Sequence, residues 1–248
     1  MSVEEDRVHM LSNTQKEIYS HSIALDEIKE IGQEKLLNSK VAVIGCGGLA
    51  SSCLIYLVSI GVGHISIIDD DVIEISNLPR QILFNVSDAG KYKVEAAKEK
   101  LAKQNKDVSI DIYKTRLSKD NAIELLQGHD VVLDCTDNFE SKFLINDICL
   151  QLNIPFVIAG VSDYQGQVTT VIPYKSQDFK SIFSIIPKSS DVDPVEKLKV
   201  FPLAVGVVSD IAAMEVIKVL LNIGELLTDK MLVVNILNNH YQIIKFPK

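Results

Sequence analysis

The feature that most constrains the fold is a short apolar run that ends abruptly in a glycine-rich turn. The run Lys-Val-Ala-Val-Ile (40–44) stops at Gly-Cys-Gly-Gly-Leu-Ala (45–50), which leads into a helical pattern that continues to residue 60. Such a run suits a buried parallel strand. Gly45, Gly47 and Gly48 let the backbone approach a phosphate, which the N–H groups of the following helix can bind. The turn predicts a nucleotide site and leaves ATP, NAD and a purely structural corner open.

Predicted strands and helices alternate through most of the chain. This alternation predicts an α/β, Rossmann-like fold with a mainly parallel sheet and helices on both faces. Three later segments (167–173, 231–235 and 241–246) have β-hairpin character, and we expect them to extend the sheet with antiparallel strands in the C-terminal half. The other strands are expected over 40–44, 64–68, 108–113, 131–134 and 155–159, and the helices over 49–60, 91–104, 119–126, 139–152 and 210–221.

The pattern divides the chain into an arm and one larger domain. Residues 1–36 are expected to form an N-terminal helical arm, and residues 37–248 to form the nucleotide-binding α/β domain, a size that one such fold can reach. Within it, residues 174–200 are rich in Lys, Ser, Asp and Pro. Because long segments of this kind are usually functional or disordered, we expect a mobile crossover loop at about 174–200.

Charge and hydropathy narrow the classes of partner. The chain has 248 residues and a net charge of −8, which argues against a broad nucleic-acid-binding face. The acidic N-terminus lacks the apolar core of a signal peptide, and no apolar run approaches the roughly 18 residues of a membrane span. We therefore expect a soluble, cytoplasmic protein with no nucleic-acid or membrane partner.

The cysteines give no sign of a metal site. Cys46, Cys53, Cys135 and Cys149 lie in or beside apolar segments, and no two form a Cys-x-x-Cys pair. This spacing indicates neither a zinc site nor a disulfide framework. We expect small buried thiols.

Charged residues after the glycine turn distinguish ATP from NAD. Asp69 ends the second predicted strand, where an acid can accept hydrogen bonds from ribose hydroxyls. A dinucleotide dehydrogenase has no need of Arg80 and Lys93, whereas the charge of a triphosphate calls for a planar guanidinium and a mobile ammonium group. Asp137, past the end of another strand, is a suitable oxygen ligand for Mg²⁺. The set favours Mg²⁺ and ATP.

With these residues the chain resembles the ThiF/MoeB/HesA family, the bacterial relatives of ubiquitin-activating enzymes. The resemblance spans roughly residues 18–245. Each motif alone is weak evidence, but their order and spacing together are specific. The matching segments are Gly-Cys-Gly-Gly-Leu-Ala (45–50), Asp69-x-Asp71, Ser-Asn-Leu-x-Arg-Gln (76–81), Lys-Val-Glu-Ala-Ala (93–97), Asp-Cys-Thr-Asp-Asn (134–138), Gly-Gln-Val (166–168) and Ala-Met-Glu-Val-Ile-Lys (213–218).

The resemblance implies an adenylyltransferase. Members of this family activate the C-terminal glycine carboxylate of a small ubiquitin-like sulfur-carrier protein, such as ThiS or MoaD, and form an acyl-adenylate and pyrophosphate from ATP. The implied catalytic residues are Arg80, Lys93 and Asp137, with Asp137 as the Mg²⁺ ligand. The implied nucleotide-binding residues are Gly45, Gly47, Gly48, Asp69, Asp71, Asn77, Arg80, Gln81, Lys93 and Asp137, with Gly48 on the phosphates, Asp69 on the ribose, and Asn77, Arg80 and Lys93 on the triphosphate.

Several of these residues also have a plainer interpretation. Arg80 and Lys93 could be ordinary solvated charges. Asn77 could cap or shape its loop, and Gln81 could orient the loop without touching the ligand. Asp137 could be the N-cap of the helix that follows it, a role compatible with metal binding.

The sequence departs from the family pattern in the arm. Many members carry an arginine in an Arg-Tyr-x-Arg-Gln motif that reaches the ATP of the partner subunit in a dimer. Residues 18–22 read Ile-Tyr-Ser-His-Ser, which places His21 where that arginine belongs. A neutral imidazole would contribute much less to a pyrophosphate clamp. We still expect a homodimer, with residues 210–221 and the first helices as its contact elements, and whether His21 replaces the arginine stays open.

Two further departures concern cysteine. No cysteine follows Cys149, so the two Cys-x-x-Cys pairs that hold zinc in many members are missing and we expect no zinc. The loop cysteine with which some members bind the carrier covalently is missing too. The reaction is expected to stop at the adenylate or to pass it to an external sulfur donor.

Other functions remain open at this point. A degenerate homologue that binds ATP or a carrier without turnover, or one half of a heterodimer, would also fit these departures. A different acceptor, such as a peptide or a modified tRNA base, is a third possibility, and an NAD oxidoreductase a remote fourth. The sequence names neither the carrier nor the pathway, since thiamine, molybdopterin and other thiolation routes share this adenylating core.

Overall fold

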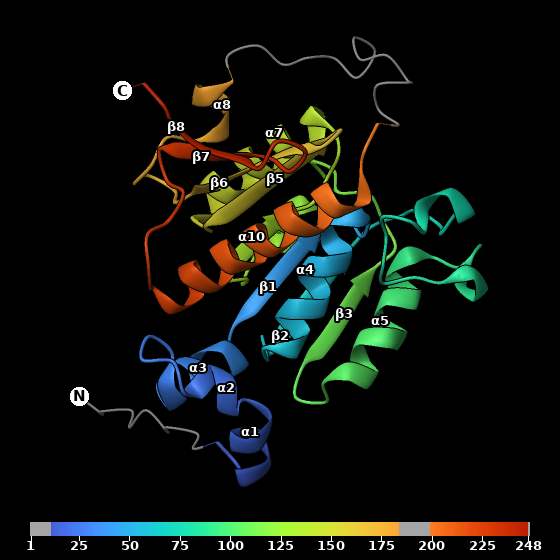
Figure 1. The fold of residues 1–248 in the computed structure, drawn as a ribbon, viewed down its shortest axis with the longest axis vertical. Helices are drawn as coiled ribbons and strands as arrows, with labels where there is room; N and C mark the ends of the chain where they lie inside the picture. The colour runs from blue at the N-terminus through green and yellow to red at the C-terminus, as the bar shows by residue number, and fades with distance from the viewer. Residues whose placement is uncertain (1–10, 184–198, 248) are drawn as a thin grey trace.

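An eight-stranded sheet runs through the molecule in the order β3-β2-β1-β4-β5-β6-β7-β8 (Figure 1). The computed structural model describes residues 11–183 and 199–247. The neighbouring strands β3, β2, β1, β4 and β5 pair in parallel. Strands β6, β7 and β8 each pair antiparallel with the strand before them. The predicted fold class is confirmed. The strands are β1 (Lys40–Ile44), β2 (His64–Ile68), β3 (Ser109–Tyr113), β4 (Val131–Asp134), β5 (Phe156–Ser162), β6 (Gln165–Val171), β7 (Lys230–Asn235) and β8 (His240–Lys245).

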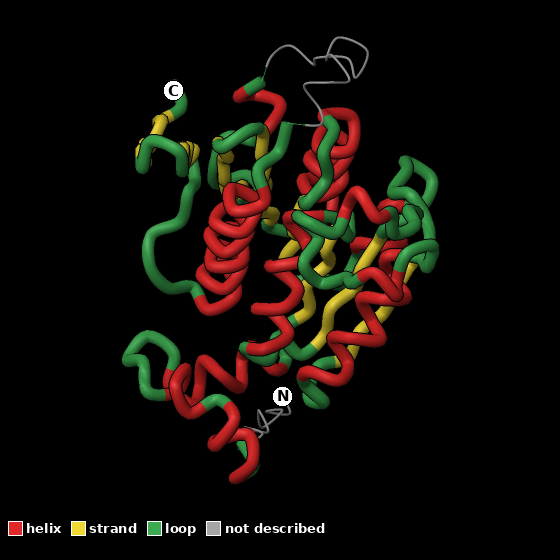
Figure 2. Tube along the Cα trace, turned by 45° about the vertical axis from the view of Figure 1, so that its right-hand side comes forward, coloured by secondary structure: helices red, strands yellow, loops and turns green. Residues whose placement is uncertain are grey.

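Helices cover both faces of the sheet (Figure 2), because the central strands are apolar on both sides. On β1, Val41 and Val43 belong to a core shared with α3, α4, α5 and α10. Ala42 and Ile44 point the other way, into a second core with α6, α7 and α8. The helices are α1 (Asn13–Ile18), α2 (Ser20–Ile23), α3 (Lys29–Leu37), α4 (Gly48–Ser59), α5 (Lys93–Gln104), α6 (Ala122–Leu126), α7 (Phe139–Leu152), α8 (Phe179–Ile182) and α10 (Pro202–Leu221), with short 3₁₀ turns η1 (Ile75–Asn77) and η2 (Val86–Asp88).

Helix α10 differs most from the prediction, which started it at Asp210. It begins at Pro202, whose fixed φ angle suits the first helical position. Leu203, Val205 and Val207 follow at once, so the first turns carry apolar residues on several sides and show no amphipathic period. Figure 1 shows α10 crossing the molecule beside α4, which it contacts.

The arm is not one continuous helix. Helices α1, α2 and α3 are separated at Tyr19 and over residues 24–28. Tyr19 is buried against Gly61, accepts a hydrogen bond from Asn105 Nδ2 at 2.8 Å and donates one to Asp107 at 3.1 Å. This contact fixes the arm at the amino ends of the strands, and residues 1–10 lie outside the described part of the chain.

The predicted crossover loop is described only at its two ends, and residues 184–198 lie outside the described ranges. Its first part contains α8, whose Phe179 is buried and packs against Phe143 of α7 with ring centroids 5.4 Å apart. Its last part pairs with the β5–β6 turn, since Asp163 and Val200 form a β-bridge. The prediction of mobility falls mainly on the residues outside the description.

Gly63 marks the closest approach between the arm and the sheet, and replacing it with alanine is expected to destabilise the protein strongly. A Cβ there would lie 1.7 Å from the carbonyl oxygen of Leu37. Relief requires the backbone to move, which we expect to cost about 3 kcal/mol or more, the upper range for overpacking. Urea unfolding of Gly63→Ala measures the change. Gly206→Ala is the matched control, because a Cβ in α10 meets nothing within 4 Å and is expected to stabilise the helix by about 0.5–1 kcal/mol. Equal stability of the two variants would contradict the account.

Candidate nucleotide site

The glycine turn lies at the carboxyl end of β1. Gly45 has φ +88°, in the left-handed region, and its N–H donates to the carbonyl of Ile68 at 2.9 Å. A Cβ on Gly45 would stand 3.0 Å from the carbonyl oxygen of Cys135. Helix α4 begins at Gly48, and no side chain caps it at Gly47. Its first N–H groups are therefore available to an anion, as phosphate binding at a helix N-terminus requires.

Gly48 allows three segments to meet. A Cβ there would lie 3.1 Å from Val205 of α10 and 3.3 Å from the carbonyl oxygen of Arg80. Any larger residue would push the start of α4 away from both neighbours. The structure thus brings the glycine turn, the start of α10 and the Arg80 segment together at one edge of the sheet.

Asp69, just past β2, braces the turn. Its carboxylate accepts hydrogen bonds from the N–H of Cys46 at 2.6 Å and from the N–H of Asp71 at 2.7 Å. Burial raises the pKa of Asp69 above its ordinary value, while these two N–H donors and the charge of Lys93 lower it. Each carboxylate oxygen keeps a further lone pair, so Asp69 can hold the turn and still accept from a ribose hydroxyl.

Lys93 is not a solvated charge. Its side chain is buried, and Nζ lies 2.7 Å from Oδ2 of Asp71, which is exposed. The backbone N–H of Lys93 also donates to the carbonyl of Asp71 at 3.0 Å. The carboxylate oxygens of Asp69, Asp70 and Asp71 approach within 4.8 Å of one another, and Lys93 offsets part of this charge. The lysine is held at the site at the start of α5.

The segment that carries Asn77, Arg80 and Gln81, residues 73–92, is named the arginine loop below. It is closed at its base, where Ile73 N–H donates to the carbonyl of Lys91 at 2.9 Å. Asn77 is buried; its side-chain oxygen accepts from the N–H of Glu74 at 3.2 Å, and its carbonyl accepts from the N–H groups of Arg80 and Gln81. The structure gives Asn77 the loop-shaping role that was one of its two interpretations.

Sequence reasoning missed the anchor of this loop. Asp88 is buried and forms ion pairs with Lys91 and with Lys100 of α5, and Lys100 also donates to the carbonyl of Leu83 at 2.9 Å. Burial alone would raise the pKa of Asp88, but hydrogen bonds from Lys100, the N–H of Asn85 and Lys91 outweigh it and lower the pKa to about 2. Lys91 is a local partner, but Lys100 lies on the separate helix α5, so its pairing with Asp88 cannot be inferred from the local sequence.

Arg80 is half-buried, and Nη1 donates to the carbonyl of Ser76 at 3.2 Å. Gln81 beside it is only 3% exposed, and its Oε1 has no hydrogen-bond partner. Its Nε2 lies 3.7 Å from the position of a Cβ on Gly47. Because buried polar groups in folded proteins are nearly always paired, this orphaned amide at the glycine turn fits a site shaped for a polar ligand.

Replacing Gln81 with methionine is expected to move stability and nucleotide binding in opposite directions. Removing an unpaired buried amide should stabilise the ligand-free protein by about 1 kcal/mol, while a ligand loses a contact of similar size. Thermal unfolding with and without ATP measures both effects. Asn77→Asp is a useful contrast, because it alters a buried polar group that already has partners. A variant that is less stable and binds ATP unchanged would contradict the assignment.

The turn after β4 presents Asp137. Its side chain is exposed, and its Oδ1 accepts only a 3.3 Å hydrogen bond from Nδ2 of Asn138 among the contacts of the described residues. Asn138, not Asp137, is the N-cap of α7, since its side-chain oxygen accepts from Ser141 N–H at 2.9 Å. The interpretation of Asp137 as the helix cap is therefore wrong, and its carboxylate is left for another partner.

His21 and a neighbouring cavity lie at the other end of the molecule. His21 is exposed on α2, within the arm that Tyr19 fixes at the amino ends of the strands. The structure does not bring it to the glycine turn of its own chain.

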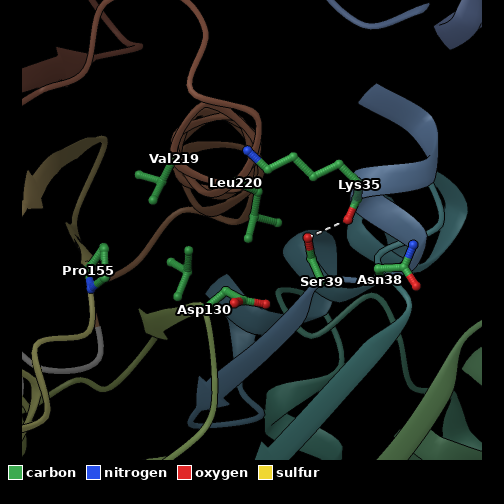
Figure 3. Close-up of a pocket in the computed structure, with 8 residues that line it drawn as sticks. Lys35, Asn38, Ser39, Asp130, Pro155, Val219 and Leu220 are labelled. Atoms are coloured by element: carbon green, nitrogen blue, oxygen red, sulfur yellow. Dashed lines mark hydrogen bonds between the residues drawn. The ribbon is translucent and has the colours of Figure 1, made fainter. Parts of the chain in front are cut away.

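A cavity of about 300 Å³ lies at this same end (Figure 3), lined by Lys35, Asn38, Ser39, Asp130, Val131, Pro155, Val219 and Leu220. It contains none of the predicted site residues.

The prediction that the cysteines are small buried thiols is confirmed. All four thiols are free and buried. Burial raises the pKa values of Cys46 and Cys149 well above the ordinary range, and contact with Cys53 together with burial raises that of Cys135.

These features describe an α/β protein with a candidate nucleotide site at the carboxyl edge of the sheet. The profile described as ThiF family matches residues 19–248, and the chain belongs to this family.

Relatives of known name support the same placement. The chain is 35% identical over 236 residues to a SAMP-activating enzyme E1 of Haloferax volcanii, which covers 95% of this chain and 87% of the relative. It is 33% identical to a sulfur carrier protein adenylyltransferase of Thermus thermophilus, over 90% of this chain and 84% of that one. The crystal structure of E. coli MccB with ATP superposes with a TM-score of 0.76 at 26% identity, over 87% of this chain and 66% of MccB. Among the described helices, none combines the length and apolar composition that a bilayer crossing requires.

Proposed function

We propose that this protein is an ATP-dependent adenylyltransferase that activates the C-terminal glycine carboxylate of a small ubiquitin-like sulfur-carrier protein. The observation that carries the proposal is the convergence at one sheet edge of the glycine turn, Asp69, the arginine loop and Asp137. The names of the relatives from Haloferax volcanii and Thermus thermophilus support the same activity.

ATP fits this edge. The N-terminus of α4 offers N–H donors to the phosphates, and Asp69 offers an acceptor to the ribose. Arg80 and Lys93 supply positive charge to the phosphates, and Asn77 holds the turn that carries Arg80. Gly45, Gly47, Asp71 and Gln81 complete the site through the contacts described above. The ATP in the MccB crystal structure, whose fold this chain shares, supports the choice of nucleotide.

Mg²⁺ is the metal that the donor set favours. Asp137 presents an exposed carboxylate with one weak hydrogen bond, and Mg²⁺ is commonly bound through one or two carboxylates together with substrate phosphates. When bound, the ion would neutralise phosphate charge that develops as pyrophosphate leaves. The sequence contains no Cys-x-x-Cys pair of the kind that holds zinc, and the proposal includes no zinc.

The reaction is an in-line substitution at phosphorus. A carboxylate oxygen of the carrier's last glycine forms a bond to the α-phosphorus, and the bond from that phosphorus to the β-phosphate oxygen breaks. The electron pair leaves with pyrophosphate, and the carrier becomes an acyl-adenylate. The protein's residues align the two reactants and stabilise the charge on the leaving group, as Arg80 and Lys93 are placed to do.

The cysteines support an end point at the adenylate. The four thiols are free and buried, and no cysteine follows Cys149 in the sequence. The sulfur donor is then a separate molecule. Which carrier is used, and in which pathway, is a matter for the assay below.

A homodimer is part of the proposal. On α10, Leu203 and Met214 are exposed, and Val207 and Ile211 between them are partly exposed, so an apolar stripe faces outward. Exposed apolar stripes of this kind commonly mark protein–protein contacts. His21 is remote from its own glycine turn, so any role in ATP binding has to be exercised on a second copy. We also propose a cytoplasmic protein, with residues 1–36 as an arm and 37–248 as the catalytic domain.

Carrier-dependent exchange of labelled pyrophosphate into ATP tests the proposal. Exchange with a ThiS- or MoaD-type carrier, and none without it, is the expected result. ATP binding without exchange for any carrier would favour a degenerate homologue or one half of a heterodimer, to which the His21 substitution already points. Exchange driven by a peptide or a tRNA would instead identify a different acceptor.

A further inference from the structure

Asp134, the last residue of β4, carries a carboxylate in the interior. Its backbone lies between Ile44 of β1 and Ile158 of β5, and its side chain is 0% exposed. An ionised carboxylate in such a place costs free energy unless it is paired and hydrogen-bonded. The partners that Asp134 has therefore show what the group does.

Both oxygens of Asp134 are occupied. Oδ1 accepts from the N–H of Thr136 at 2.9 Å and from its hydroxyl at 2.7 Å. Oδ2 lies 3.2 Å from Nζ of Lys142, a buried residue in the first turns of α7. Lys142 also donates to the carbonyl of Ala159 at 2.9 Å. The pair connects the end of β4 and the middle of β5 to α7, and it holds the turn between β4 and α7.

This turn, residues 135–138, touches the nucleotide site twice. The carbonyl oxygen of Cys135 is the atom that a Cβ on Gly45 would meet at 3.0 Å, so the turn forms a wall of the glycine turn. Its exposed member is Asp137. The turn is fixed at one end by Asp134 and at the other by Asn138, which caps α7.

Stability alone is a weak explanation for the pair. Replacing a buried ion pair with apolar residues of similar volume is often neutral or stabilising, so such a pair is poor evidence of a stabilising role. Here Oδ1 of Asp134 accepts both of its hydrogen bonds from Thr136, in the turn that carries Asp137. Outer partners that orient a metal-binding carboxylate are common in metal sites.

We propose that Lys142, acting through Asp134, is a positioning residue that holds Asp137 in place for Mg²⁺ and ATP. This inference rests on the proposed function, in which Asp137 is the metal ligand. Lys142 does not touch the nucleotide in this account, and its effect passes through the hydrogen bonds of Asp134 to Thr136.

The test is the Mg²⁺ requirement of ATP binding, measured by equilibrium dialysis without any carrier. Lys142→Met is expected to raise the Mg²⁺ concentration for half-maximal ATP binding by about 10- to 100-fold, the usual effect of losing an outer-shell partner. ATP binding in the absence of Mg²⁺ should change little. Lys142→Arg, which keeps a donor and a charge, should recover most of the native Mg²⁺ response.

Lys180→Met is the matched control, because Lys180 also pairs with an acid of α7, Asp147 at 2.5 Å, but the pair is half exposed. If Lys142→Met does not fold, the double variant Asp134→Asn with Lys142→Met removes both charges together and should fold while showing the same Mg²⁺ defect. A folded variant with the native Mg²⁺ requirement, or with equal loss of Mg²⁺-free binding, overturns the inference. Absence of ATP binding in the native chain would instead count against the proposed function.

Discussion

Replacing Asp137 with alanine is expected to abolish carrier-dependent pyrophosphate exchange while leaving the fold intact. The carboxylate is exposed, and the cap of α7 is supplied by Asn138, so its loss removes no structural contact of weight. Loss of even an outer partner of a metal typically costs about 10- to 100-fold, and loss of the ligand itself should cost at least that much. Exchange at saturating Mg²⁺ and ATP is the measurement.

Two variants separate a metal role from a helix role. Asp120→Ala removes another exposed carboxylate, from the segment before α6, and should keep native exchange. Asn138→Ala removes the cap and should lower stability by about 1 kcal/mol. Native exchange in Asp137→Ala, or a loss of stability as large as that of Asn138→Ala, would remove the metal assignment.

Replacing Arg80 with alanine is expected to lower the rate of exchange by about 10- to 150-fold, the equivalent of the 1.5–3 kcal/mol of a hydrogen bond to a charged group. The backbone carbonyl and Cγ of Arg80 lie beside Gly48. Among the described residues the guanidinium is held only by its hydrogen bond to the carbonyl of Ser76, so it can turn to a phosphate at little cost. Exchange measured over a range of ATP concentrations shows whether the loss lies in binding or in the chemical step.

Lys106→Ala serves as the control, because Lys106 is exposed and lies between α5 and β3, at the amino end of that strand. Lys100→Met adds a second comparison, since it loosens the loop and leaves Arg80 in the chain. A Lys100→Met protein with the defect of Arg80→Ala would indicate that loop position dominates. Full activity of Arg80→Ala would show that its charge is not used.

The parts of the fold that depend on local sequence patterns could be predicted. The run before Gly45 ends at a residue that must turn, and the apolar strands of β1, β2 and β4 are short and uninterrupted. The start of α10 could not be predicted, because that helix is apolar on several sides and has no amphipathic period. The breaks in the arm depend on Tyr19 reaching Gly61, a tertiary contact that no local pattern encodes.

The candidate site shows the same division. The motif spacing predicted Asp69, Arg80, Lys93 and Asp137 as site residues. The parallel strands then bring the segments that carry them to one edge of the sheet, because their carboxyl ends lie side by side. The pairing of Lys93 with Asp71 and the choice of Asn138 over Asp137 as helix cap were both beyond the sequence. In each case two chemically suitable neighbours compete, and only backbone geometry decides between them.

The four buried cysteines have a practical consequence for studying this chain. A thiol reagent can modify them only when the surrounding structure opens, so the labelling rate reports the free energy of opening around each one. Cys46 lies within the glycine turn, where its N–H is bonded to Asp69, whereas Cys149 lies in α7 on the opposite face of the sheet. The unmodified sequence therefore contains two internal probes, and a bound ligand at the turn should slow the alkylation of Cys46 more than that of Cys149.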